Sequence, residues 1–140
     1  MGRQIYKSFT ILCFFVSLAV GIGHTQSASG TFTARIPFEF TVGNQIFPAG
    51  EYKVKALLPH TLSVGNKNRR AMTNVSTNSL ESTNVPADAK LVFHGYNGRY
   101  YLAQAWMAGD NVGHEVIKSS AEKELARQTP NRQVALVTMQ

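Results

Sequence analysis

The sequence predicts one mainly β domain, either an antiparallel β-sandwich or a small β-barrel of six to seven strands, with one short C-terminal helix. Short segments alternate between apolar and polar residues, as half-buried strands do. Turn-forming residues separate these segments, and Asn97-Gly98 has the strongest turn preference among them. Helical spacing occurs once, near the C-terminus. Strands alternating with helices would predict a parallel sheet, and the sequence does not show that order.

The N-terminal residues have the three-part form of a secretory signal peptide. A basic start is followed by the apolar run Ser8–Gly23 and then by small and polar residues. The run is shorter than the ~20 apolar residues of a membrane span, and a retained N-terminal anchor is the alternative. We therefore expect a signal peptide at residues 1–28, cleaved between residues 23 and 29, and a single β domain at residues 30–140. This predicts export to the periplasm or the extracellular space, with no transmembrane span in the mature chain.

Cleavage would remove the only cysteine, Cys13, which lies inside the apolar run. Leu12 precedes it, where a lipoprotein signal has a small residue, so we expect no lipid anchor. The mature chain then has no disulfide, and the core of about 110 residues must stabilise it alone. The net charge of +6 falls to about +4 once Arg3 and Lys7 leave. The remaining basic residues are spread along the chain, as on an ordinary solvated surface, and we predict no nucleic-acid partner.

Four strands are expected in the first half of the mature chain. Thr31–Val42 alternates, and Pro37 marks an edge or a bulge within it because proline cannot donate to a ladder. Two turns follow, of which Phe47–Gly50 has the type I pattern. The other strands are expected at Glu51–Leu58, where Leu58 faces inward, and at Thr61–Val64 and Arg69–Val75. Residues 76–89 are mostly small and polar and predict a loop, either mobile or folded over one end of the sheet.

The segment Lys90–Met107 is expected to form a β-hairpin around Asn97-Gly98. A two-residue type I′ turn needs positive φ at both positions, which Asn-Gly tolerates best. The turn sets the register, so that Tyr96 lies opposite Arg99 and, further along, Val92 lies opposite Ala103. Leu91 is then expected opposite Gln104.

Side chains of this hairpin alternate between two faces. On the face toward the core, the ring of Tyr100 can lie across the bare backbone of Gly95. Gln104 is the only clearly polar residue of the core face, which consists of Leu91, Phe93, Gly95, Tyr100, Leu102, Gln104 and Trp106. The second face consists of Lys90, Val92, His94, Tyr96, Arg99, Tyr101, Ala103 and Ala105, and its aromatic members could form a wet patch.

The C-terminal segment changes to helical spacing. Ser119 and Glu122 have the spacing of a capping box, which predicts a helix at Ser120–Gln128 that ends at Thr129-Pro130. Arg132–Met139 is expected to form the last strand. We expect it to pair inside the sheet, because an unpaired apolar strand would promote aggregation.

No catalytic residue set is evident, and we predict no catalytic residues, no metal ligands and no cofactor. His60, His94 and His114 are not at ligand spacing, whereas zinc needs three or four converging ligands. The sequence has no Gly-x-Ser-x-Gly motif and no glycine-rich phosphate loop. The candidate ligand-binding patch consists of His94, Tyr96, Arg99 and Tyr101, where aromatic rings could stack against a ligand.

Two blocks carry a resemblance to a known family. They are Ile36–Val54 (IPFEFTVGNQIFPAGEYKV) and Leu91–Ala126 (LVFHGYNGRYYLAQAW…GHEVIKSSAEKELA). Both resemble a family of small exported bacterial β proteins of unknown function, and the Phe-Pro-Ala-Gly-x-Tyr turn and the Phe-His-x-Tyr hairpin are the more specific parts. The resemblance implies export and a β fold. It implies no activity, ligand or site residue.

We therefore expect a non-enzymatic binding or envelope-associated module. Its partner is unknown and could be an envelope component, a small apolar ligand or a glycan. An apolar ligand would need an open barrel interior. One alternative is a hydrolase with its site at the open end of the sheet, which requires histidines and carboxylates to converge. The other is a structural subunit of an assembly, which would show an exposed strand edge or a large apolar patch.

Overall fold

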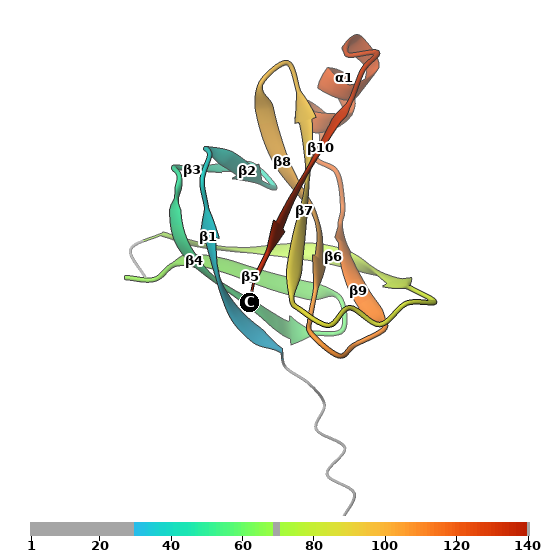
Figure 1. The fold of residues 1–140 in the computed structure, drawn as a ribbon. Coiled ribbons are helices and arrows are strands. Elements are labelled where there is room, and N and C mark those ends of the chain that lie inside the picture. The colour runs from blue at the N-terminus through green and yellow to red at the C-terminus, as the bar shows by residue number, and fades with distance from the viewer. Residues whose placement is uncertain (1–29, 69–70, 140) are drawn as a thin grey trace, which may run out of the picture.

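The computed structural model describes residues 30–68 and 71–139 of the chain, so the predicted signal peptide and its cleavage site lie outside the described residues. These residues form ten strands and one helix, α1 (Ser120–Gln128), which lies beside one end of the sheet (Figure 1). The strands are β1 (Thr31–Ile36), β2 (Phe40–Val42), β3 (Gln45–Phe47), β4 (Gly50–Leu58), β5 (Thr61–Asn66), β6 (Met72–Glu81), β7 (Lys90–Tyr96), β8 (Arg99–Trp106), β9 (Val112–Val116) and β10 (Gln133–Thr138).

All ten strands belong to one curved sheet that is not closed into a barrel. Antiparallel pairing runs in the order β1-β4-β5-β6-β9-β8-β7-β10, and β2 and β3 attach to the start of β8 through a short parallel pair. β6 pairs with β5 through its first half and with β9 through its second half. It therefore joins an N-terminal half-sheet (β1, β4, β5) to a C-terminal half-sheet (β9, β8, β7, β10). In Figure 1, β5 runs across the view, whereas β7 and β10 stand upright.

The prediction of a mainly β chain with one short helix is confirmed, although the strands outnumber the six to seven expected. The core lies on the concave side of the sheet and is filled by side chains. Phe40 is central, and its ring centroid lies 5.5 Å from Phe47, 4.9 Å from Tyr52 and 5.5 Å from Phe93. These rings fill the centre of the core around Phe40.

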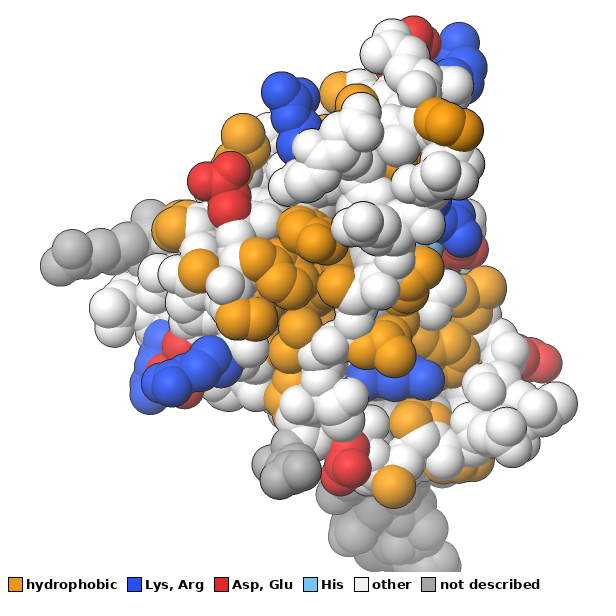
Figure 2. Space-filling view, turned by 45° about the horizontal axis from the view of Figure 1, so that its top comes forward, with side chains coloured by type: hydrophobic (Ala, Val, Ile, Leu, Met, Phe, Trp, Pro, Cys, Tyr) orange, Lys and Arg blue, Asp and Glu red, His pale blue; other side chains and the backbone are white. Residues whose placement is uncertain are grey.

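The core is closed less completely where β1 and β10 approach each other without pairing. Half-buried apolar side chains pack against the core from these two strands, among them Phe32, Ala135 and Val137. Figure 2 shows hydrophobic side chains gathered at the centre of one face of the molecule.

Three expectations for the strands are corrected. Thr31–Val42 divides into β1 and β2, because the chain leaves the ladder at Pro37. Leu58 is exposed, since a register shift after Ala56 turns the end of β4 outward. Residues 76–81 are not a loop but the second half of β6, which pairs with β9.

The remaining loop, residues 82–89, folds over one end of the sheet. The backbone N–H of Ser82 donates to the carbonyl of Asn111 at 2.8 Å, and the N–H of Gly109 donates to the carbonyl of Pro86 at 2.8 Å. Both bonds tie the loop to the turn between β8 and β9.

The β7–β8 hairpin has the predicted turn. Asn97 and Gly98 adopt φ of 51° and 80°, the positive values that a type I′ turn requires. Near the turn the register is as predicted, from Tyr96 opposite Arg99 to Phe93 opposite Leu102. Tyr100 also lies across Gly95, because a Cβ atom on that glycine would stand 2.9 Å from its ring.

Further from the turn, a β-bulge changes the register. Val92 lies opposite Gln104 instead of Ala103, and Leu91 lies opposite Ala105. The extra residue reverses the faces of the last part of β8, because side chains alternate along a strand. Ala105 joins the core, and Gln104 moves to the outer face, which removes the one polar residue from the predicted core face.

Trp106 moves to the outer face together with Gln104, which corrects its predicted place in the core. Its ring is still buried, because it lies flat over Gly113 of β9, where a Cβ atom would stand 2.6 Å from the indole. Its Nε1–H donates to Oε1 of Gln104 at 3.0 Å, and Nζ of Lys90 lies 5.5 Å from the ring centroid.

The C-terminal elements form at the predicted residues. Oγ of Ser119 accepts a hydrogen bond from the backbone N–H of Glu122 at 3.2 Å, which caps α1. β10 pairs with β7 and forms an edge of the described sheet instead of lying inside it. Val134 and Leu136 are exposed on its outer face.

Candidate functional site

Helix α1 contacts the predicted patch on the β7–β8 hairpin at Tyr96. Tyr96 is 1% exposed and Tyr101 is 8% exposed, so the expected wet surface is instead a buried one. His94 is half-buried, and only Arg99 is exposed. The structure thus brings His94, Tyr96 and Tyr101 onto one face, as predicted, but the helix lies at this face. Their ligand-binding role stays a prediction.

A polar cluster lies where α1 meets the hairpin. It is centred on Glu122 of α1, which is only 4% exposed. The hydroxyl of Tyr96 donates to Oε1 of Glu122 at 3.2 Å. Burial raises the pKa of the Glu122 carboxyl, because the low-dielectric surroundings favour its neutral form. Burial first, and then the Glu122 charge, raise the pKa of the Tyr96 hydroxyl.

His94 lies in the same region. Its Nδ1 is buried and has no hydrogen-bond partner among the described residues. Burial, followed by the positive charges of Arg132 and Lys118, lowers the pKa of His94 to about 4. The imidazole is therefore neutral near pH 7.

A small hollow adjoins this cluster beside the hairpin turn. Its volume is about 310 Å³, and both Arg99 and Tyr101 line it. Glu39 and the exposed Ile46 line it from the segment that carries β2 and β3. Two of the four predicted site residues thus line this hollow, whereas His94 and Tyr96 do not line it.

Among residues 30–68 and 71–139, no hydrogen bond or ion pair joins a histidine to a carboxylate, and the hydrolase alternative stays a prediction. Among the described residues, the one hydrogen bond of a histidine ring joins Nδ1 of His114 to Oγ1 of Thr77 at 3.3 Å. Burial lowers the pKa of His114. Residues 30–68 and 71–139 also hold no group of three or more His, Cys, Asp or Glu side chains that could bind a metal.

A larger groove lies on the outer face of the N-terminal half-sheet. Its volume is about 550 Å³. The groove follows from side-chain size, because small residues on β5 lie between long residues on its two neighbours. Ser63 pairs with Lys55 and Asn74, and Gly65 pairs with Lys53 and Met72.

These small residues form the floor of the groove. The side chain of Ser63 points outward yet is 6% exposed, because the longer neighbours rise on both sides of it. The lining residues are Thr33, Lys53, Lys55, Leu57, Ser63, Gly65, Asn66, Lys67, Met72 and Asn74. Three of them are lysines and none is acidic, so the groove is positively charged.

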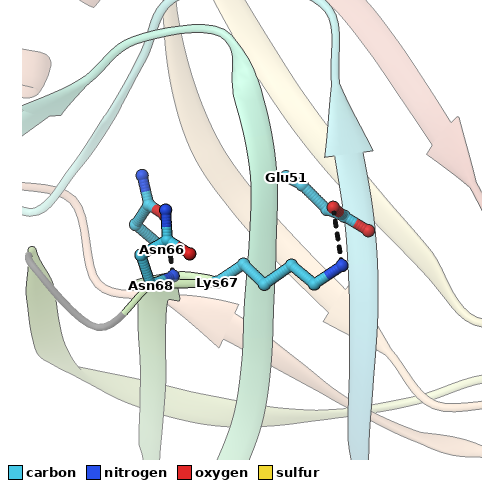
Figure 3. A network of polar contacts seen from close by, with 4 residues as sticks. All are labelled: Glu51, Asn66, Lys67 and Asn68. Carbon is cyan, nitrogen blue, oxygen red and sulfur yellow. Dashed lines mark hydrogen bonds and ion pairs between the residues drawn. The ribbon is translucent and has the colours of Figure 1, made fainter.

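The lysines differ in their partners. Nζ of Lys67 lies 3.2 Å from Oε2 of Glu51, and the two side chains are 65% and 38% exposed, so the pair adds little stability. Figure 3 shows this pair beside the turn in which the backbone N–H of Asn68 donates to Oδ1 of Asn66 at 3.0 Å. Lys53 and Lys55 form no ion pair with another described residue.

The sequence analysis treated the basic residues as spread over an ordinary solvated surface and did not single out these lysines. The missed feature was the outward position of Ser63 and Gly65 on the neighbouring strand. Small residues between longer ones indicate a groove only when the register of three strands is known, and the turns alone did not fix that register.

Comparisons with protein-family models, curated proteins and solved structures found no match to this chain. The family resemblance of the two sequence blocks therefore stays a prediction. The described part of the chain contains no helix with the length and apolar character that crossing a bilayer would require.

Proposed function

We propose that this protein is an exported, non-enzymatic binding module that holds an anionic glycan in the groove on the outer face of the N-terminal half-sheet. One observation carries the proposal: Lys53, Lys55 and Lys67 line a groove of about 550 Å³ that has no acidic residue in its lining. Lysine ammonium groups supply charge to carboxylate or phosphate groups without imposing a fixed geometry.

The uncharged lining residues favour a sugar over a simple anion. Ser63, Asn66 and Asn74 offer hydroxyl and amide groups that donate and accept hydrogen bonds. These groups match the hydroxyl groups of a glycan, whereas the lysines match its acidic substituents. A groove along a strand also accommodates an extended chain better than a compact molecule.

Binding of polygalacturonate, a carboxylated glycan, tests the proposal, with uncharged dextran as the comparison ligand. Each exposed lysine–anion contact contributes about 0.3–1 kcal/mol. The Lys53→Gln/Lys55→Gln variant should therefore bind polygalacturonate about 3- to 30-fold more weakly in isothermal titration calorimetry. The affinity should also fall as salt is added, because the contacts are solvent-exposed.

Two further variants separate the groove from general charge attraction. Lys123→Gln/Arg127→Gln removes the same charge from the exposed side of α1 and should leave the affinity unchanged. Ser63→Leu keeps every charge but fills the floor, and it should weaken binding. Equal losses in both charge variants, or full binding by Ser63→Leu, would overturn the proposal.

A structural role in an assembly is a second candidate, favoured by one edge of the sheet. β10 pairs only with β7 within the described sheet, and Val134 and Leu136 are exposed on it. Exposed apolar edge strands promote pairing between chains. Sedimentation equilibrium of the wild type and of Leu136→Lys tests this role: a concentration-dependent oligomer that the variant abolishes would support it, and a monomer at all concentrations would exclude it.

A further inference from the structure

Helix α1 is attached to the sheet in an unusual way. A surface helix normally buries an apolar stripe. In α1 the only buried side chain is that of Glu122, a carboxylate, while Leu125 and Ala126 are half-buried. The polar contacts to the hairpin are the Tyr96–Glu122 hydrogen bond of 3.2 Å and a bond of 3.4 Å between Nδ2 of Asn97 and Oγ1 of Thr129. Burying a carboxylate opposes docking of α1, so Glu122 offsets part of what these contacts contribute.

The hairpin surface that α1 contacts at Tyr96 carries groups that are typical of a binding site. The rings of Tyr96 and Tyr101 lie 5.9 Å apart at an angle of 67°. Next to them, Nδ1 of His94 is buried without a partner among the described residues. Buried polar atoms are nearly always paired, so this unpaired nitrogen is a candidate contact point for a ligand group.

The hollow beside the hairpin turn is continuous with this surface through Tyr101. Arg99 and Glu39 line the hollow as well. Both side chains are exposed, and together they can donate to and accept from hydroxyl groups. The aromatic rings offer apolar faces to the C–H side of a sugar ring.

We propose that α1 is a releasable cover, and that its departure joins the hollow at Arg99 and Tyr101 to the rings beneath it as one binding surface for neutral sugar rings. In the closed state, Tyr96 is buried, His94 is half-buried with its Nδ1 covered, and the hollow is open. In the open state, both tyrosine rings and Nδ1 of His94 face the ligand. This surface is separate from the lysine groove and does not depend on it.

Two substitutions at Glu122 shift the cover in opposite directions. Glu122→Ala leaves the Tyr96 hydroxyl without its acceptor and should open α1. Glu122→Gln keeps an acceptor oxygen but has no charge to desolvate, so it should close α1 more firmly. Glu124→Ala and Glu124→Gln are the matched controls, because Glu124 is exposed on the same helix.

Opening is measured by amide hydrogen exchange of Ser120–Gln128 and by the rate at which tetranitromethane nitrates Tyr96 and Tyr101. Glu122→Ala should accelerate both by about tenfold, the effect expected for a lost buried hydrogen bond, and Glu122→Gln should slow both. Ser119→Ala, which lacks only the helix cap, provides a milder opening variant if Glu122→Ala fails to fold. Rates in the Glu122 variants that equal those of the Glu124 controls would show that α1 is not a cover.

Binding is measured with cellohexaose, an uncharged oligosaccharide, by chemical-shift titration. Its affinity should rise in Glu122→Ala, fall in Glu122→Gln and be lost in Tyr101→Ala. Lys53→Gln/Lys55→Gln should bind it normally, so failure of the groove proposal and failure of this one are distinguishable. No binding to Glu122→Ala, or the same affinity in all variants, would overturn the inference.

Discussion

Gly113→Ala tests the reversed face of β8 most directly. A Cβ atom at position 113 would stand 2.6–2.7 Å from three atoms of the Trp106 ring, which real Cβ contacts do not tolerate. The indole cannot turn away freely, because Gln104 holds its Nε1 and Lys90 lies over its face. The substitution must therefore move the ring or displace β9.

The expected cost follows from what the ring would lose. A net hydrogen bond contributes about 1 kcal/mol, a cation–π contact at a partly exposed site about 0.5–1 kcal/mol, and strain in a packed site usually costs about 1–3 kcal/mol. Because a shift of the ring relieves part of the strain while breaking the contacts, we expect a loss of about 2–3 kcal/mol. For a domain of this size the melting temperature should fall by about 8–12 °C.

Urea unfolding followed by tryptophan fluorescence measures the effect. Gly50→Ala is the matched control, because a Cβ atom there would meet only Tyr52 at an ordinary 3.7 Å. In a Trp106→Leu background, which contains no tryptophan and is followed by far-ultraviolet circular dichroism instead, the cost of Gly113→Ala should shrink, since leucine can turn aside. If Gly113→Ala stays within about 0.5 kcal/mol of the Gly50→Ala control, Trp106 does not lie over β9 and the bulge is wrongly placed.

Three other substitutions test the hairpin and its surroundings. Leu102→Ala should lower the free energy of unfolding by about 2–5 kcal/mol, because the side chain is 2% exposed. Leu136→Ala is the control and should be nearly neutral, because that residue is 64% exposed. Equal losses in urea unfolding would contradict the assigned faces. Asn97→Ala should cost about 1 kcal/mol because alanine resists φ of 51°, and Asn97→Gly should cost less. His94 has its pKa lowered from 6.5 to about 4, so its contribution to stability is complete above pH 6.5 and is lost progressively as the pH falls toward 4. The stability advantage of His94 over His94→Gln should therefore shrink over that pH interval. Both proteins carry Glu122→Gln as well, because the raised pKa of Glu122 has the opposite effect on stability. A difference that stays constant with pH would refute the assignment.

The hairpin shows which features of the fold were predictable from sequence. Asn97 and Gly98 fix their turn through local backbone preference, so the turn and the adjacent pairs could be predicted. The bulge at Ala103 depends on where β8 meets β2 and β9, which are distant in sequence. Gln104 on the predicted core face was the available warning, because a polar side chain rarely lies unpaired in a core.

The second half of β6 was missed for a related reason. Ser76–Glu81 has few apolar residues, and small polar residues predict a loop. In the structure the segment is a strand because β9 supplies its ladder, and only Thr77 of this segment is buried. Strand preference depends on the neighbouring strand more than on the segment itself.

The candidate site was predicted in part. Near the turn, alternation placed His94, Tyr96 and Tyr101 on one face as in the structure, but the contact of α1 with this face was not foreseen. Helical patterning places a glutamate on the solvent side, whereas Glu122 points toward Tyr96. The capping-box spacing identified where α1 begins, yet a cap describes only the helix end and says nothing about the surface on which the helix lies.

The position of β6 has a consequence for how the protein unfolds. The first half of its ten residues pairs with β5 and the second half pairs with β9. Neither half-sheet can therefore unfold without breaking its hydrogen bonds to this shared strand. Loss of cooperativity would require this strand to break in its middle, near Val75–Thr77. Heat and urea should therefore produce a single transition, and the amides at this junction should exchange with solvent only when the whole domain opens.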